Sequence, residues 1–141
     1  MLGCLFCAIA AGDTPAQIVH ADDEVVAFLD HRPIFYGHTL VIPRQHHETL
    51  TDLPGSSIRN YFTTVQFLTG VVQEAMSAKG TFVAMNNVVS QSVPHLHTHI
   101  VPRNPKDGLR GFFWPRTSYE GVEHMTEVAD RIRAVAGGRG K

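Results

Sequence analysis

The sequence predicts an α+β domain in which one long helix packs against an antiparallel sheet of about five strands. Apolar residues recur with helical spacing over one long central stretch, and short β-branched runs bounded by Pro, Gly or Asp lie on both sides of it. At 141 residues, with no repeat or low-complexity block, the chain fits a single domain over residues 1–141 that has its own hydrophobic core.

Each element follows from its spacing and from the residues that end it. Gly12 and Gly80 are plausible helix stops, and Pro43 ends a strand because it lacks an N–H. In chain order, we predict a short helix in "CLFCAIAAG", strands over residues 18–20, 25–30 and 38–43, a helix over 54–79, strands in "TFVAMN" and "HLHTHIVP", and a helix over 122–135.

Composition excludes several classes of function. Twelve Lys+Arg against thirteen Asp+Glu leave a net charge of −1, which does not fit binding to a long nucleic acid. No apolar run approaches the roughly 18 residues that a membrane span needs, and the first residues lack the charged start of a signal peptide. We therefore expect a cytoplasmic protein that does not bind membranes, and a small anionic ligand stays open.

The stretch "SQSVPHLHTHIVPR" carries histidines at alternate positions. In a strand, His95, His97 and His99 project from one face, about 7 Å apart, while the residues between them face the long helix. Three interpretations compete: a surface strand rich in His, a three-histidine metal site, and nucleophilic and acid–base chemistry on phosphate. The preceding "NNVVSQS" favours the third interpretation, because amides and hydroxyls are neutral donors suited to a phosphoryl group.

This stretch resembles the signature of the histidine triad (HIT) family, in which three histidines alternate with apolar residues. "CLFCAIAAGDTPAQIVHADDEVVAFLDHRP" and "GHTLVIPRQHHETLTDL" also resemble the family's N-terminal segments, so the likeness extends from Cys4 to about Arg103. The resemblance implies a HIT-like fold with a core over residues 1–105 and a C-terminal extension over 106–141. That extension, which contains the only tryptophan, Trp114, looks like the one in the fragile-histidine-triad branch.

The resemblance also implies catalytic roles. His97 would attack the α-phosphorus of a nucleotide and form a nucleotidyl-histidine intermediate, which water then resolves. His99 and Ser92 would hold phosphate oxygens, and Gln91 would lie near the bridging or leaving oxygen. His95, the first triad histidine, completes the catalytic set, and no metal ion is expected at the reacting centre.

For the nucleoside, the resemblance implies that Asp30 binds the ribose hydroxyls and that apolar side chains flank a purine base. Without the resemblance, Asp30 would be interpreted as a turn residue and the apolar side chains as core. Asn86 would lie near the phosphate or ribose, although the loop over 86–91 is shorter than usual and Ser90 replaces a common glycine. The residues assigned to the nucleoside are Phe6, Ile9, Phe28, Asp30, Asn86 and Ser92.

Cys4 and Cys7 form the only C-x-x-C motif. The motif alone also fits a redox pair or two reduced thiols. A zinc-containing branch of the family completes such a site with two histidines, here His46 and His95, and the resulting closed tetrahedral set would hold a structural Zn²⁺.

Together these features predict a nucleotide hydrolase that releases a nucleoside monophosphate from dinucleoside polyphosphates, nucleoside phosphoramidates or both. A nucleotidyl transferase or phosphorylase, or a nucleotide-binding scaffold with incidental hydrolysis, is the alternative. His99 favours hydrolysis, because the transferase and phosphorylase branches usually carry glutamine at this position. The resemblance further implies a homodimer.

Overall fold

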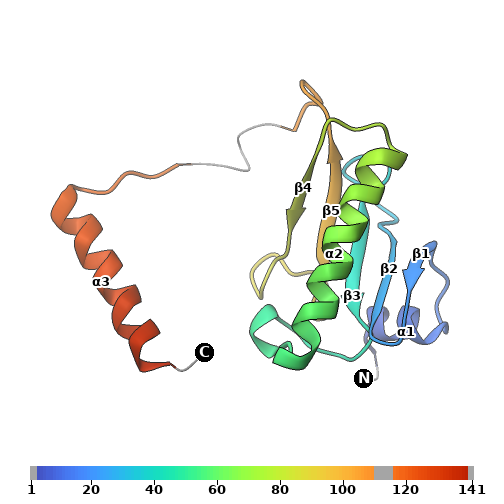
Figure 1. Cartoon of the computed structure of the whole chain (residues 1–141), viewed down its shortest axis with the longest axis horizontal. Coiled ribbons are helices and arrows are strands. Elements are labelled where there is room, and N and C mark those ends of the chain that lie inside the picture. The colour runs from blue at the N-terminus through green and yellow to red at the C-terminus, as the bar shows by residue number, and fades with distance from the viewer. Residues whose placement is uncertain (1–2, 110–115, 140–141) are drawn as a thin grey trace. The chain divides into compact units, whose positions relative to one another are not determined.

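The computed structural model describes residues 3–109 and 116–139, and its order of elements confirms the predicted fold class (Figure 1). A 3-10 turn at Leu50–Asp52 is an addition to the predicted elements. The elements are α1 (Leu5–Ala11), β1 (Ile18–Ala21), β2 (Val25–Leu29), β3 (Thr39–Pro43), α2 (Gly55–Ala75), β4 (Gly80–Ala84), β5 (Thr98–Arg103) and α3 (Val122–Gly138).

The chain forms two compact units, Met1–Asp107 and Gly108–Lys141. The expected division between residues 105 and 106 lies close to this boundary, and Trp114 lies outside the described residues. In the second unit, α3 confirms the helix predicted from its apolar spacing. No helix in the described ranges is both long and apolar enough to cross a membrane.

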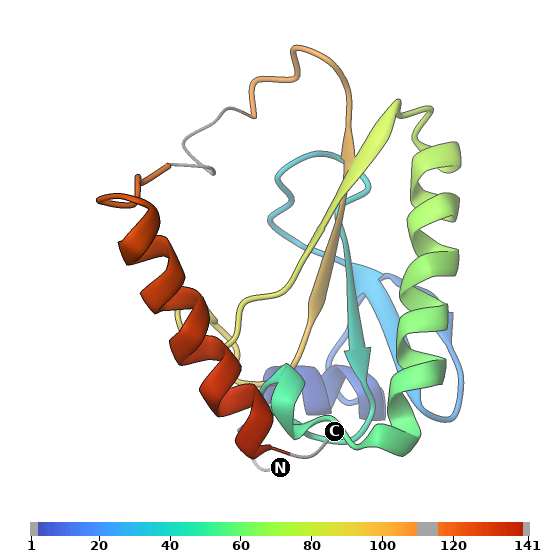
Figure 2. The same cartoon turned by 60° about the vertical axis from the view of Figure 1, so that its left-hand side comes forward.

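The sheet of the first unit has five strands in the order β1-β2-β3-β5-β4, and every neighbouring pair is antiparallel. β5, which contains the last histidine of the run, His99, is therefore an inner strand between β3 and β4. The long helix α2 lies across one face of the sheet, as two views of the ribbon show (Figures 1 and 2).

Alternation along the strands divides the core between the two faces of the sheet. Val25 and Ala27 of β2 belong to the cluster that packs under α2, whereas Val26 and Phe28 belong to a second cluster with Phe6 of α1. The short helix α1 therefore covers part of the face opposite α2.

The same alternation holds at the histidine run. Leu96 and Ile100 are buried in the cluster under α2. Between them, Thr98 Oγ1 lies 2.7 Å from the buried hydroxyl of Tyr61, which also donates to the Val41 carbonyl at 2.9 Å. The expectation that one face of this segment packs on the long helix is thus confirmed.

The boundary of this strand differs from the prediction, because β5 begins at Thr98 and not at His95. The pairing with β3 stops at Val41 and Thr98, and the N–H of Leu96 donates to the His47 carbonyl at 2.6 Å, outside the sheet. The Pro43 carbonyl, at the end of β3, accepts a hydrogen bond from Nε2 of His95 at 2.7 Å. His95 and His97 therefore lie in an irregular segment that enters the strand.

Candidate active site

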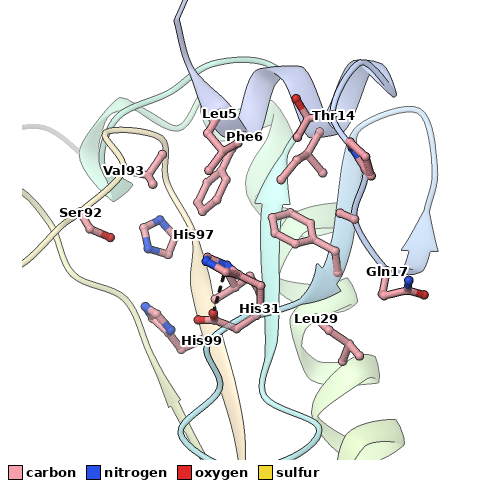
Figure 3. A pocket seen from close by; sticks show the side chains of 16 residues that line it. Leu5, Phe6, Thr14, Gln17, Leu29, His31, Ser92, Val93, His97 and His99 are labelled. Carbon is pink, nitrogen blue, oxygen red and sulfur yellow. Dashed lines mark ion pairs between the residues drawn. The ribbon is translucent and has the colours of Figure 1, made fainter.

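A cavity of about 690 Å³ lies on the face of the sheet that α1 covers (Figure 3). Figure 3 shows Phe6 projecting from α1 towards the labelled His97, with Ser92 and Val93 beside them. Most of the residues assigned to catalysis or the nucleoside line this cavity; these are Phe6, Ile9, Phe28, Asp30, Ser92, His97 and His99. The sequence analysis missed three polar members of the wall, Thr14, Gln17 and His31.

His97 has one ring nitrogen fixed by the backbone. Its Nδ1 lies 2.8 Å from the carbonyl oxygen of His95. Because a carbonyl can only accept a hydrogen bond, Nδ1 carries a proton, and in the neutral ring the lone pair is on Nε2. The ring is 4% exposed and packs edge-on against Phe6, with centroids 5.0 Å apart. The contact thus fixes one tautomer for the neutral ring of His97, with Nε2 as the nitrogen that carries the lone pair.

His99 is held by a histidine that the sequence analysis did not single out. The N–H of Ile34 donates to Nδ1 of His38 at 3.1 Å, so Nε2 of His38 carries the proton. That Nε2–H donates to Nδ1 of His99 at 2.9 Å, which leaves the Nε2–H of His99 available as a donor. The pairing of Leu40 with His99 brings His38, two residues earlier, to this position, and no local motif marks it.

Burial keeps both members of this pair neutral. It lowers the pKa of His38, and it lowers the pKa of His99 to about 4, with smaller contributions from His97 and His38. At neutral pH, His99 is therefore an uncharged donor whose ring centroid lies 5.0 Å from that of His97.

Asp30 directly follows β2, and its contacts bear on both of the roles considered for it. Its Oδ1 accepts the N–H of Arg32 at 2.9 Å, as a turn residue would. Its Oδ2 lies 3.8 Å from Nε2 of His38, and the side chain lines the cavity with 18% of its surface exposed. A carboxylate at this point can accept hydrogen bonds from a ligand's hydroxyl groups.

The amides of the loop over residues 86–91 bond to the protein itself. Gln91 donates from Nε2 to the Glu48 carbonyl at 2.6 Å and accepts the Val88 N–H at 2.9 Å. Asn86 donates to the Ser90 carbonyl at 3.3 Å. Val88 and Ser90 have positive φ values of 70° and 62°, and this region is especially unfavourable for Val88, which is β-branched. The hydrogen bonds of Gln91 and Asn86 therefore stabilise a strained loop. Neither Gln91 nor Asn86 is among the residues that line the cavity.

The predicted metal ligands do come together. Nδ1 of His95 lies 3.4 Å from Sγ of Cys4 and 3.5 Å from Sγ of Cys7, and Nδ1 of His46 lies 3.4 Å from Sγ of Cys7. All four ligand atoms lie within 4.8 Å of one another. Sulfur and nitrogen ligands on one tetrahedral zinc are about 3.6 Å apart, so the set fits this ion.

The tautomer of His95 fits as well. Its Nε2 lies 2.7 Å from the Pro43 carbonyl and must carry the proton, so Nδ1 presents a lone pair to the thiols. Burial lowers the pKa of this ring to about 4, which keeps it neutral, as a metal ligand must be. Its placement makes His95 a candidate ligand and scaffold residue behind the cavity.

A second group with metal-ligating atoms, Asp30, His38 and His99, fits a metal less well. The Ile34 N–H donates to Nδ1 of His38, so Nε2 of His38 carries the proton. Nε2 is the nitrogen that would have to bind the ion. Among the described residues, His95, His97 and His99 do not form a metal-ligating group together, so the interpretation of the triad as a three-histidine metal site is not supported.

Comparisons with known proteins agree with this geometry. A family model described as the HIT domain matches residues 11–106. The chain is 37% identical over 113 residues to Protein hit of Bacillus subtilis, covering 79% of this chain and 78% of that protein. The crystal structure of a member of the HIT family from the same organism matches 94% of this chain and 96% of its own, with 32% identity and a TM-score of 0.84.

Other similar proteins carry more specific names. Adenylylsulfatase HINT3 of Arabidopsis thaliana is 32% identical and covers 75% of this chain and 55% of its own length. The asymmetrical bis(5'-nucleosyl)-tetraphosphatase of Schizosaccharomyces pombe is 34% identical over 65% of this chain and 52% of its own length. A Zn-bound histidine triad protein from Mycobacterium smegmatis matches 98% of this chain and 99% of its own, with 31% identity and a TM-score of 0.72. The match of the HIT-domain model to residues 11–106, together with these similar proteins and structures, shows that this chain belongs to the histidine triad (HIT) family.

Proposed function

We propose that this protein hydrolyses nucleotides at the α-phosphate through a covalent intermediate on His97. The observation that carries the proposal is the bond from Nδ1 of His97 to the His95 carbonyl, which makes Nε2 the nitrogen that carries the lone pair when the ring is neutral; the ring lines the cavity. An uncharged imidazole of this kind is an effective nucleophile towards phosphorus. Names of two relatives, an adenylylsulfatase and a dinucleoside tetraphosphatase, support hydrolysis of a bond to the α-phosphate.

In the first step, the lone pair of Nε2 of His97 forms a bond to the α-phosphorus while the bond from phosphorus to the leaving group breaks. The leaving group takes the electron pair of that bond. The Nδ1–H of the resulting charged ring stays hydrogen-bonded to the His95 carbonyl, which stabilises the positive charge. The Nε2–H of His99 donates to an oxygen of the reacting group, where negative charge increases in the transition state.

In the second step, water attacks the phosphorus, and the P–N bond breaks with its electron pair returning to Nε2 of His97. The products are a nucleoside monophosphate and a proton. Ser92, at the cavity wall beside His97, would hold a phosphate oxygen, and Asp30 would bind the ribose. The apolar wall of Phe6, Ile9 and Phe28 would receive the base, with purines favoured because they bury more surface.

Three further points stay predictions from the resemblance. They are the choice between a phosphoanhydride and a phosphoramidate substrate, the homodimer and the cytoplasmic location.

Product analysis tests the proposal. Purified wild-type protein and His97→Ala are given adenosine phosphoramidate and diadenosine tetraphosphate side by side. Wild type should release AMP, and the variant should lose several orders of magnitude in kcat while still binding AMP. Equal turnover by both proteins, or no turnover of either substrate by wild type, would overturn covalent catalysis at His97 and leave a nucleotide-binding role. The faster substrate identifies the preferred leaving group.

A further inference from the structure

The candidate metal cluster and the nucleotide cavity are built from the same two segments of chain. In α1, Phe6 lies between the two cysteines of the cluster, Cys4 and Cys7, and its ring lines the cavity (Figure 3). The Phe6 ring contacts Phe28 and His97 edge-on, with centroids 5.4 and 5.0 Å apart. Any shift of the first turn of α1 would therefore displace the wall that receives the base.

The second shared segment is the one that carries the nucleophile. The ring of His95 faces Cys4 and Cys7, and its Nε2–H donates to the Pro43 carbonyl at 2.7 Å. The backbone carbonyl of the same residue holds Nδ1 of His97 at 2.8 Å. Rotation or displacement of His95 would thus change both the ligand set and the orientation of His97.

Without a metal ion, α1 depends on packing and on weak polar contacts with the rest of the unit. A seven-residue helix is far too short to be stable alone, so its order depends on these contacts. Among the described residues, its anchors include apolar packing of Phe6 and Ile9, the hydrogen bond from Arg44 to the Ala10 carbonyl at 2.7 Å, and sulfur–nitrogen contacts of 3.4–3.5 Å. A metal ion would replace these weak sulfur–nitrogen contacts with coordinate bonds that link α1 directly to His95.

We propose that metal binding by Cys4, Cys7, His46 and His95 is coupled to nucleotide binding in the cavity. The ion fixes α1 and the His95 segment in the arrangement that receives the nucleotide, so each ligand raises the affinity for the other. Phe6 and His95 are the positioning residues that transmit the effect. The inference uses the proposed function only in placing a nucleotide in the cavity.

Thermodynamic linkage makes the proposal quantitative. The factor by which zinc strengthens nucleotide binding must equal the factor by which the nucleotide strengthens zinc binding. Coupling between neighbouring sites is commonly about 5- to 150-fold, and shared elements of this kind should give at least the lower figure. A metal that only stabilised the fold, with α1 already in place, would leave both affinities unchanged.

The test measures both affinities on the full-length protein. AMP binding is followed by calorimetry with chelator-treated protein and with protein carrying one equivalent of Zn²⁺. Zinc binding is followed by competition with a chromophoric chelator, with and without saturating AMP. We expect zinc to tighten AMP binding by at least about fivefold, and AMP to tighten zinc binding by the same factor. AMP binding that is equally tight in both forms would overturn the coupling and leave the proposed function intact, whereas no AMP binding in either form would overturn the nucleotide site itself.

Two neighbouring histidines provide matched variants. His46→Gln removes a ligand that neither lines the cavity nor holds His97, so its AMP affinity should equal that of zinc-free wild type and no longer respond to zinc. His47→Gln makes the same change outside the cluster and should keep the wild-type response. If His46→Gln does not fold, the size of the factor in wild type still decides the matter, because affinities that do not change with the second ligand refute the coupling.

Discussion

Replacing His38 by Asn should impair turnover far more than substrate binding. Asn can still accept the Ile34 N–H near the position of Nδ1, but it has no group at the position of Nε2, which donates to His99 at 2.9 Å. His99 is then free to carry its proton on Nδ1, which would turn a lone pair instead of an N–H towards the phosphate oxygens. Loss of one preorganised donor costs about 10²- to 10³-fold in kcat, and loss of a group that orients a catalytic residue costs about 10- to 100-fold. We therefore expect a decrease in kcat of about 100-fold, with KM changed by less than about threefold.

The assay is AMP release from adenosine phosphoramidate and diadenosine tetraphosphate under steady-state conditions, with urea unfolding as a check on the fold. His38→Gln should recover part of the loss, because its amide N–H can reach the position of Nε2. His20→Asn serves as the control, since His20 pairs with Asp22 away from the cavity. A folded His38→Asn protein with kcat within about threefold of wild type would refute the argument that His38 sets the tautomer of His99.

Three further predictions concern pH, the core and the loop. Because burial lowers the pKa of His99 to about 4, from 6.5 in the unfolded chain, the unfolded state binds more protons between these values. The free energy of unfolding should therefore fall as pH decreases from 6.5 towards 4, and His99 should contribute up to about 1.4 kcal/mol per pH unit to this fall. Urea titrations at several pH values should show a shallower fall for His99→Asn than for wild type. Tyr61→Phe should destabilise the protein by about 1–3 kcal/mol in thermal or urea unfolding, because it leaves buried acceptors without a donor. Tyr36→Phe, at an 84% exposed position, is the control and should change the free energy of unfolding little. Gln91→Ala should speed amide hydrogen exchange over residues 86–91 and raise KM equally for both substrates; a loss of kcat that depends on the leaving group would instead place Gln91 at the reacting centre.

The fold and the packed face of the histidine run were largely predictable from local pattern. Helical spacing of apolar residues identified the helix that became α2, and alternation placed Leu96 and Ile100 on the face beneath it. The spacing of Cys4 and Cys7 indicated a ligand pair, and the resemblance supplied His46 and His95, which the structure brings within reach. Apolar spacing and the C-x-x-C motif are short-range patterns, which a sequence displays directly.

The roles of His38 and Gln91 could not be predicted, because each depends on a contact between segments far apart in the chain. His38 lies against His99, 61 positions away, only because β3 pairs with β5 in one register. Gln91 bonds to the Glu48 carbonyl, 43 positions away, and thereby takes part in holding the loop.

By itself, the sequence determined which residue types were available for phosphate chemistry and metal binding, and which face of each element is apolar. Only the tertiary structure decided which nitrogen of each histidine carries the proton. That choice depends on the backbone group that bonds to one of the two ring nitrogens. This group is the His95 carbonyl for His97, the Pro43 carbonyl for His95 and the Ile34 N–H for His38. All three partners are backbone groups: the His95 carbonyl and the Ile34 N–H lie two and four positions from the histidines that they hold, and the Pro43 carbonyl lies 52 positions from His95. Every peptide unit has the same groups, so no side-chain pattern records them.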